Sequence, residues 1–488
     1  MKRLKNILFY IIIIGGFSSL MYWIISTGKN LEQGRNIVTN FTTGNSFQGF
    51  TESFVESMQH PAGILLLQVT LIIIVARIFG WIFKKIGQPT VLGEILAGIV
   101  LGPSLLGLYF PEVSTFIFPT QSIGNLQVLS QIGLVLFMFV IGMELNLNVL
   151  KNKAHEAVVI SHASIIVPFA AGIGLAYFIY TSFAPEGVAF ASFGLFLGIS
   201  MSITAFPVLA RIIQERGMQK TRLGAIAITC AAADDITAWC LLAAVIAIVK
   251  AGSFVSSIYT ILLAVIYVII MIKVVRPLLK KVGKSYEERK SFGTSDIALF
   301  FIVLLISSFV TEIIGIHALF GAFMAGTVMP DNQKFRNMFI ERIEDVALVL
   351  LLPLFFVVTG LRTEIGLLND PQLWEVTGLI ILVAVIGKFG GSALAARFTG
   401  QSWKDSLTIG TLMNTRGLME LVVLNIGYDL GVLNAQIFAM MVIMALVTTF
   451  MTGPLLNLIQ KVFKGSEDKY PCDYKARTEY ISPDKNID

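Results

Sequence analysis

Two adjacent acidic residues, Asp234 and Asp235, lie inside the apolar stretch 219–250, in the sequence AAADDITAW. Counted from Arg222 at the basic end of this stretch, they lie about 12 residues, or roughly 18 Å, into a helix. A carboxylate near the centre of a bilayer costs about 2.5–3.5 kcal/mol on insertion scales. Two in succession are hard to explain as packing alone. They predict a site that binds a proton or a small, hard cation.

A candidate partner for one of these carboxylates is Lys388, which lies deep in the apolar stretch 373–397. A lone buried lysine would lose its charge, whereas a buried Asp–Lys pair keeps both charges and titrates as a unit. Neighbouring helical residues point about 100° apart, so one aspartate can face this lysine while the other faces a cavity. The alternative is that Lys388 extends its side chain to the nearer membrane surface.

Two further apolar stretches are interrupted by polar residues or proline. In the stretch 188–213, Thr204 is followed by Pro207, which removes a backbone donor and restrains the residue before it. In the stretch 405–426, the interruption is Asn414, Thr415 and Arg416. Both predict broken helices, whose exposed carbonyls and helix ends can offset buried charge. The alternative is a proline kink and a short polar loop that only pack.

Oxygen ligands for a cation are few in these stretches. Thr204, Thr237 and Asn414 are the candidates, together with carbonyl groups exposed at the breaks. Arg416 and Glu420 are four residues apart, so we expect them to pair and to support the second broken helix. His317 lies near the start of the apolar stretch 314–329, and we expect it to make a hydrogen bond at a helix end, with a pH-sensing role as the alternative.

The composition explains where these residues must lie. Of 488 residues, 55% are hydrophobic and 14% are charged, whereas soluble proteins are about a quarter charged. A membrane span needs about 20 mostly apolar residues. The chain divides into thirteen such segments: 61–82, 88–105, 124–146, 155–180, 188–213, 219–250, 254–275, 295–311, 314–329, 345–361, 373–397, 405–426 and 432–460.

The predicted fold is therefore an all-α membrane protein with 13 core helices and one extra N-terminal helix. We expect residues 1–60 to form that helix and an extracytoplasmic polar segment, 61–462 the transmembrane domain, and 463–488 a cytoplasmic tail. The first apolar stretch, 7–25, is either a signal peptide or a retained span. A retained span is favoured because the stretch is longer than a secretory core and ends in a poor cleavage site.

Positive charge alternates between the loops. The loops 106–123, 181–187, 312–314 and 427–431 contain no lysine or arginine. The intervening loops are basic, which places both termini in the cytoplasm, with the inner membrane of a bacterium as the expected location. The basic residues form no stripe with aromatic residues, so nucleic acid is not an expected partner. No nucleophile–base pair, cofactor motif or metal-ligand spacing is present, and we expect no enzymatic activity and no cofactor.

Two stretches resemble each other in their small residues, at 93–103 and 321–330, and both end in or beside a proline. If they correspond, the thirteen segments divide into six, one linker and six. The second six then begin on the opposite side of the membrane, as in an inverted-topology repeat, and the two broken helices cross near the midplane. The alternative is that small residues recur wherever helices pack tightly.

At these residues the chain resembles the monovalent cation/proton antiporter superfamily, in the branch of the Kef-type efflux systems and the plant and fungal cation/proton exchangers. The matching motifs are GQPTVLGEILAG at 87–98, TAFPVLARI at 204–212, AADDITAW at 232–239, GIHALFGAFMAG at 315–326 and MNTRGLMELVVLNIG at 413–427. The resemblance covers about residues 61–460, and its last three motifs look most like the plant and fungal exchangers.

The resemblance implies a homodimer with a dimerisation domain and a mobile core domain that carries the ion site. It implies that Asp235 is the main ion-binding and proton-binding carboxylate, and that Asp234 pairs with Lys388. Members with two aspartates and this lysine tend to move more protons than cations. The expected function is exchange of Na⁺ or K⁺ for protons by alternating access, with a role in pH homeostasis. A channel-like K⁺ efflux protein and a non-transporting sensor of the same fold are the alternatives.

Overall fold

The structure is a computed structural model. It describes residues 2–32, 51, 60–144, 154–218, 221–251, 254–281, 294–330, 336, 339–341, 343 and 345–463. Helices are the only regular secondary structure in these ranges, which confirms the all-α prediction. The predicted tail beyond residue 463 and most of the predicted polar segment before residue 60 lie outside the described residues.

The chain forms two compact units, Met1–Ile64 and Leu65–Asp488. The first contains α1 (Lys2–Gly28), followed by a 3₁₀ turn, η1 (Lys29–Glu32). From Phe9 to Gly28 this helix is apolar and long enough to cross a membrane. Its described side chains are exposed almost throughout, as expected for a helix that faces lipid.

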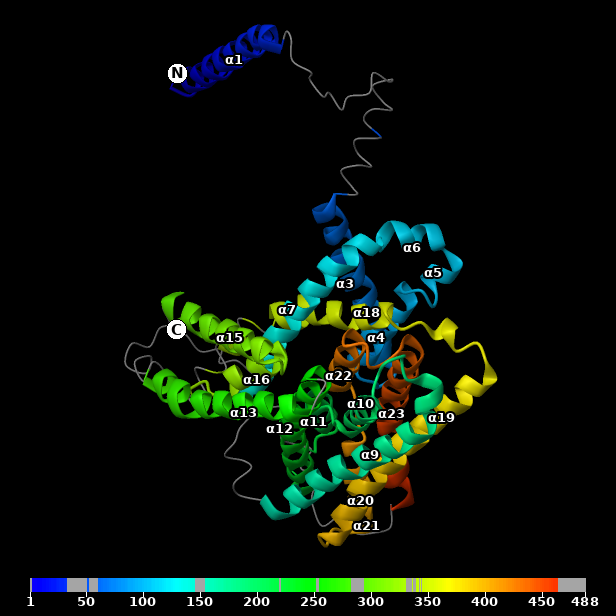
Figure 1. Ribbon diagram of the computed structural model, residues 1–488. Coiled ribbons are helices and arrows are strands. Elements are labelled where there is room, and N and C mark those ends of the chain that lie inside the picture. Colours follow the sequence, from blue (N-terminus) through cyan, green and yellow to red (C-terminus); the bar gives the residue numbers. More distant parts are fainter. Residues whose placement is uncertain are drawn as a thin grey trace. The chain divides into compact units, whose positions relative to one another are not determined.

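The second unit carries the predicted segments as helices (Figure 1). Among the described residues of the whole chain, 11 helices are long and apolar enough to span a membrane, and α10 and α16 are shorter apolar helices. The chain is an integral membrane protein. The helices of the second unit are α3 (Pro61–Lys85), α4 (Thr90–Leu101), α5 (Leu106–Tyr109), α6 (Pro111–Ile117), α7 (Thr120–Glu144), α9 (Ala154–Phe183), α10 (Phe190–Ser202), α11 (Phe206–Glu215), α12 (Arg222–Ala251), α13 (Phe254–Ile270), α15 (Thr294–Ile314), α16 (Ala318–Thr327), α18 (Leu352–Leu361), α19 (Pro371–Val385), α20 (Gly391–Phe398), α21 (Trp403–Met413), α22 (Leu418–Asp429) and α23 (Ala435–Val462).

Glycine contacts reveal the internal repeat. A Cβ atom on Gly93 of α4 would collide with the carbonyl oxygen of Phe79 in α3, and one on Gly321 of α16 would collide with that of Ser307 in α15. The two glycines and the two carbonyl residues are each separated by 228 positions. This close contact of α4 with α3 therefore recurs, at equivalent residues, between α16 and α15.

The two halves also exchange helices. Gly98 of α4 packs against the backbone of Val357 in α18, and Gly326 of α16 packs against the backbone of Phe139 in α7. The second helix of each half thus lies on the third helix of the other half. Six predicted spans lie between α4 and α16, so the prediction gives the second copy the opposite direction in the membrane. The recurring glycine contacts support the predicted internal repeat, and its small residues mark close backbone approach.

The two interrupted segments meet at their breaks. Residues 203–205 separate α10 from α11, and residues 414–417 separate α21 from α22. The backbone N–H of Ala205 in the first break donates to the carbonyl of Thr415 in the second, at 3.0 Å. Four half-helix ends therefore converge inside the protein. In Figure 1 α10, α11, α12 and α22 lie in the interior of the second unit.

Candidate ion-binding site

Asp234 lies on α12 and its carboxylate is surrounded by donors. One carboxylate oxygen accepts a hydrogen bond from Ser161 at 2.6 Å. The other accepts from Ser164 at 2.7 Å and from Thr204 at 2.8 Å. The ammonium of Lys388 lies 3.1 Å from the same oxygen. Four donors, from α9, the first break and Lys388, thus surround this buried carboxylate. Its oxygens are already occupied and are poorly placed to bind a transported ion.

Lys388 lies in a π-helical turn, η5 (Ile386–Gly390), between α19 and α20. Such turns are rare and frequently occur at functional sites. Besides Asp234, its ammonium donates to the carbonyl of Ser164 at 2.9 Å and to the carbonyl of Ser202. The ammonium thus has as many acceptors as hydrogens. It lies fully inside the protein and does not extend to the membrane surface.

Asp235 is the next residue of α12, and its surroundings are different. Its side chain is 1% exposed, and neither carboxylate oxygen has a hydrogen-bond partner among the described residues. Buried polar groups without partners are rare and costly in native proteins. The vacant oxygens of Asp235 are therefore the part of this region best suited to bind a proton or an ion.

Asn414, at the second break, is another buried group whose polar atoms lack partners. It forms the end of α21 at the second break, and its side chain is fully buried. Neither its amide oxygen nor its amide nitrogen has a partner among the described residues. An amide oxygen is a suitable ligand for a hard cation. Asn414 therefore keeps the role of candidate ligand that its position in the sequence predicts.

The two predicted threonine ligands are committed elsewhere. The hydroxyl of Thr204 donates to Asp234 and also lies 3.2 Å from the carbonyl of Met413. The hydroxyl of Thr237 donates to the carbonyl of Ala233 in its own helix, at 2.9 Å. Thr204 therefore positions Asp234 and joins the two breaks, whereas Thr237 makes a local bond within α12.

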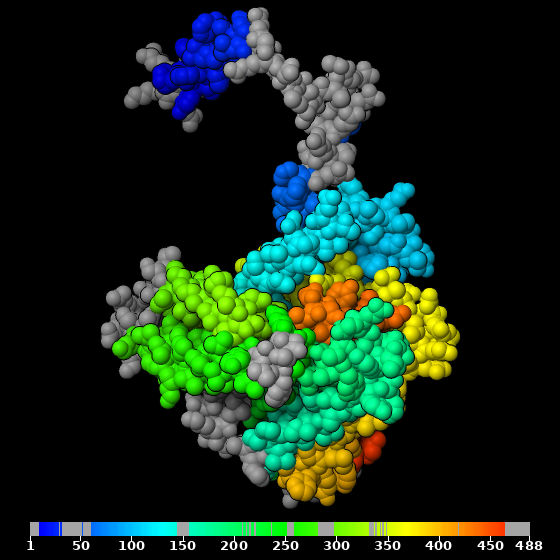
Figure 2. Space-filling model, in the orientation of Figure 1, coloured from blue at the N-terminus to red at the C-terminus, as the bar shows by residue number. Residues whose placement is uncertain are grey.

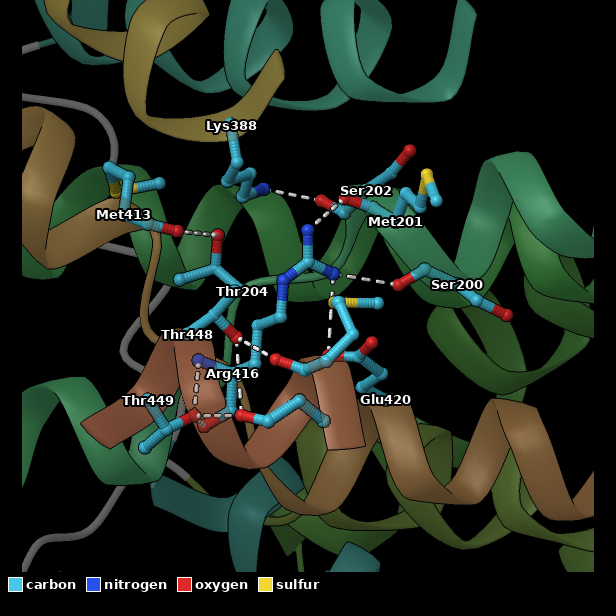
Figure 3. Close-up of polar contacts among 12 residues, drawn as sticks. Ser200, Met201, Ser202, Thr204, Lys388, Met413, Arg416, Glu420, Thr448 and Thr449 are labelled. Atoms are coloured by element: carbon cyan, nitrogen blue, oxygen red, sulfur yellow. Dashed lines mark hydrogen bonds and ion pairs between the residues drawn. The ribbon is translucent and has the colours of Figure 1, made fainter. Parts of the chain in front are cut away.

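Arg416 extends from the second break to the end of the first broken helix. Its guanidinium donates to the carbonyls of Ser200 at 2.9 Å and Met201 at 2.7 Å, in the last turn of α10. Figure 3 shows Arg416 and Lys388 both directed at the residues Ser200–Ser202. The unsatisfied carbonyls of a helix end carry partial negative charge, which these two cations offset. Arg416 also forms the expected pair with Glu420, at 3.3 Å and without hydrogen-bond geometry.

The remaining predicted residues, Pro207, Thr415 and His317, lie at helix ends or in the second break. Pro207 is the second residue of α11, where its missing N–H is no loss to the helix, so it begins a helix and does not kink one. The hydroxyl of Thr415 lies 3.3 Å from that of Thr452 on α23. His317 accepts a hydrogen bond from the backbone N–H of Leu319 at the start of α16, as expected.

Sequence reasoning missed the two serines that bind Asp234. Ser161 and Ser164 are three residues apart in α9, so both point to one face of that helix. A pair of hydroxyls at this spacing in an apolar stretch is a weak signal, because serine also recurs at ordinary helix contacts. The two serines become donors to Asp234 only because α9 packs against α12.

The charges around the breaks do not cancel. We call Asp234, Asp235, Glu420, Lys388 and Arg416 the charge cluster; all five are buried, and they act on one another electrostatically. Fully ionised, its three carboxylates and two cations leave one net negative charge. An unbalanced buried charge is expensive in a membrane. One bound proton or one bound monovalent cation would neutralise the cluster.

Residues 71–461 match the family described as sodium/hydrogen exchanger, transmembrane. The chain belongs to this family. The resemblance seen in the sequence motifs is thereby confirmed. The match covers both breaks and every member of the charge cluster, so the family assignment and the geometry concern the same part of the molecule.

Curated relatives of this exchanger family member are named for cation/proton exchange. The chain is 41% identical to the Na⁺/H⁺ antiporter NhaS4 of Synechocystis, over 80% of this chain and 96% of that protein. It is 40% identical to cation/H⁺ antiporter 17 of Arabidopsis thaliana, over 90% of this chain and 52% of that protein. It is 34% identical to the K⁺/H⁺ antiporter 1 of Saccharomyces cerevisiae, over 86% and 49%. The chain thus spans about half the length of these plant and yeast relatives.

A solved structure shares the fold. The sodium proton antiporter MjNhaP1 from Methanocaldococcus jannaschii superimposes with a TM-score of 0.58 at 15% sequence identity, over 82% of this chain and 98% of that chain. At this identity the similarity shows the architecture alone. The exchanger fold of the chain is therefore supported by the sequence family and by a structural neighbour.

Proposed function

We propose that this exchanger family member carries a monovalent cation, Na⁺ or K⁺, in exchange for protons, and that Asp235 binds the two in turn. The observation that carries the proposal is the contrast within α12. Asp234 is saturated by four donors, whereas the buried oxygens of Asp235 have none among the described residues. A carboxylate in such a place needs a neutralising partner from solution.

Competition between the two ions follows from the charge cluster. Its single net negative charge is balanced by one proton or by one monovalent cation, and binding both would leave an uncompensated positive charge. If the site opens to one side at a time, loading a proton from one face and a cation from the other gives obligatory exchange. This mechanism requires no covalent step and no cofactor, so the protein acts as a transporter and not as an enzyme.

The ligands of the cation are the carboxylate of Asp235, the amide oxygen of Asn414 and carbonyl oxygens at the two breaks. Arg416 and Lys388 already occupy the carbonyls at the end of α10. They fix the shape of the first break without entering the ligand set. The names of the relatives include both Na⁺/H⁺ and K⁺/H⁺ antiporters, so both cations belong in the test.

The arrangement in the membrane is part of the proposal. We place both termini in the cytoplasm because the basic loops share one side of the membrane. The protein would then lie in the cytoplasmic membrane of a bacterium, as a homodimer with a scaffold and a mobile core. The exchanged packing of α4 on α18 and α16 on α7 supports a rigid scaffold, because backbone contact at glycines leaves little room for sliding.

Reconstitution into proteoliposomes tests the proposal. A pH-sensitive dye inside the vesicles should report proton movement when Na⁺, K⁺ or Li⁺ is added in turn. Asp235→Asn should abolish the signal. Asp370→Asn is the matched control, because Asp370 is an exposed residue that caps the start of α19, and asparagine preserves that cap. A cation-driven signal that persists in Asp235→Asn would overturn the site, and cation flux without proton movement would indicate a channel.

A further inference from the structure

Two cavities lie beside the second halves of the two broken segments, α22 and α11. The larger, of about 170 Å³, lies between the start of α16 and the length of α22, and its lining includes His317, Val422, Asn425 and Asp429. The smaller, of about 30 Å³, lies between the loop that precedes α4 and the helices α11 and α23, and its lining includes Pro89, Thr449 and Gly453. The larger cavity therefore borders α22, the second half of the second broken segment. The smaller cavity borders α11, the second half of the first broken segment.

The internal repeat relates these two cavities. Pro89 precedes α4 and His317 precedes α16, and the two positions differ by the same 228 residues that relate Gly93 to Gly321. Gly87 and Gly315, also 228 apart, both have positive φ angles, 74° and 93°. The two cavities are thus equivalent places in the two halves. With the halves inverted as the sequence predicts, these equivalent places face opposite sides of the membrane.

The larger cavity leads toward the ion site. It extends along α22 from Asp429 to Val422, which is a rise of roughly 10 Å in a helix. Val422 is one turn from Leu418, where α22 begins after the second break. In Figure 2 residues in orange, the colour of α22 in Figure 1, reach the surface beside residues in cyan. We call the larger cavity, beside Asp429, the wider route, and the smaller cavity, beside the loop before α4, the narrower route.

Arg362, the residue that follows α18, joins the two sides of the wider route. Its guanidinium forms an ion pair with Asp429 at 2.9 Å and donates to the amide oxygen of Asn425 at 2.7 Å. It also lies over the ring of Tyr428, at 5.7 Å from the ring centre. The amide nitrogen of Asn425 donates in turn to Thr359 of α18, at 2.9 Å. We call this set the α18–α22 latch.

The latch differs from the other contacts of α18. On its opposite side, Gly360 approaches the backbone of Gly98 in α4 so closely that neither position has room for a Cβ atom. Such a contact keeps α18 and α4 together as one body. The contact with α22 is instead made by long polar side chains, which exchange protein partners for water when the helices separate.

We propose that Arg362 is a latch residue that stabilises the conformation in which the route along α22 is open, and that it releases α22 in each transport cycle. To close this route and widen the one beside α4, α22 must move relative to α18. A displacement of a few ångström takes the guanidinium beyond hydrogen-bond range of both Asn425 and Asp429. The inference rests on the proposed exchange function, because it assigns the latch a step of the alternating-access cycle.

Thiol labelling tests the latch without measuring transport. In the full chain, with Cys230, Cys240 and Cys472 replaced by alanine, one cysteine is introduced at Ile426 in the larger cavity or at Gly453 in the smaller one. A Cβ at Gly453 meets only ordinary contacts, at 3.5 Å and beyond. A charged, membrane-impermeant methanethiosulfonate is added to one face of reconstituted vesicles at a time, and the labelling rate is followed.

Arg362→Gln should slow labelling of the cysteine at 426 and speed labelling of the cysteine at 453. A charged hydrogen bond contributes enough to shift the balance of the two conformations by roughly tenfold. Asp429→Asn should act in the same direction, and Arg362→Gln with Asp429→Asn together should add little, because the first change already removes the pair. Arg362→Lys, which keeps the charge, should have the smallest effect.

Unchanged labelling at both positions in Arg362→Gln and in Asp429→Asn overturns the proposal, and so does a rise at both positions, which indicates local unfolding. Comparing these labelling rates with exchange measured on the wild-type protein separates the latch proposal from the proposed exchange function. If exchange is absent in the wild-type protein but the opposed shifts occur, the latch stands and the proposed function fails. If exchange is present and the opposed shifts are absent, the latch alone fails.

Discussion

The two sides of α12 present the same chemical group in opposite situations. Asp234 faces α9 and the π-helical turn, where hydroxyls and an ammonium surround its carboxylate. Asp235, one residue later, has buried oxygens to which the described part of the chain supplies no hydrogen bond. The residue type is the same and the burial is nearly the same. The neighbouring helices therefore determine the role of each carboxylate. Asp234, held by its donors, is the anchor of the site, whereas Asp235 keeps its oxygens available for an ion.

The contrast is sharpest at Asp235 itself. Asp235→Asn should reduce cation-driven proton movement in proteoliposomes to the level of empty vesicles, because the exchanging charge is gone. The fold should tolerate the change, since the wild-type side chain contributes no hydrogen bond within the described residues. The melting temperature in detergent should therefore be equal or higher. A variant that is inactive because it has lost several degrees of stability would contradict the assignment of roles.

The anchor side should respond in the opposite way. Lys388→Ala removes the cation from Asp234 and leaves a buried carboxylate with hydroxyl donors only. Breaking a buried ion pair on one side costs about 3–5 kcal/mol. Thermal unfolding of the purified protein should show this loss. The apparent KM for the cation in any remaining exchange should change less. Stability equal to that of the wild-type protein would show that the pair is not an anchor.

A smaller effect is expected from the hydroxyls on the same side. Ser164→Ala removes a hydrogen bond to a charged acceptor, which contributes about 1.5–3 kcal/mol. Ser130→Ala is a suitable control, because Ser130 is also a buried helix serine but bonds only a carbonyl in its own helix. The melting temperature should fall more in the first variant. Equal losses of melting temperature in both variants would show that Ser164 contributes no more than an ordinary buried helix serine.

The smallest effect should come from the ligand side. Asn414→Ala deletes one oxygen of the proposed cation site without touching Asp234 or Lys388. A single neutral ligand contributes about 1 kcal/mol, so the apparent KM for the cation should rise roughly fivefold. The stability should stay close to that of the wild-type protein. An unchanged KM for Na⁺ and for K⁺ would remove Asn414 from the ligand set.

Much of the fold was predictable because the membrane imposes simple rules. Span length, loop charge and the recurring glycines at 93 and 321 predict the segments and their inversion. The breaks were predictable because Pro207 and Asn414 are unusual inside apolar stretches. The glycines are informative because each allows a backbone contact that a larger side chain would prevent.

The partner of each charged group was less predictable. Ser161 and Ser164 become donors only because α9 packs beside α12, and a serine pair in an isolated helix does not reveal its neighbour. Arg416 was expected to support its own helix, yet it also binds the end of α10, more than 200 positions earlier. Arg362 likewise depends on α22. Such contacts are set by the tertiary arrangement and leave no local pattern.

The most direct test of the central claim is proton release on cation binding. Na⁺ or K⁺ is added to the purified protein in a weakly buffered solution, and the pH is recorded. If Asp235 holds either ion but not both, the wild-type protein should release about one proton per chain, and Asp235→Asn should release none. Equal release from both proteins would contradict the account, because the exchanged proton would then come from another group.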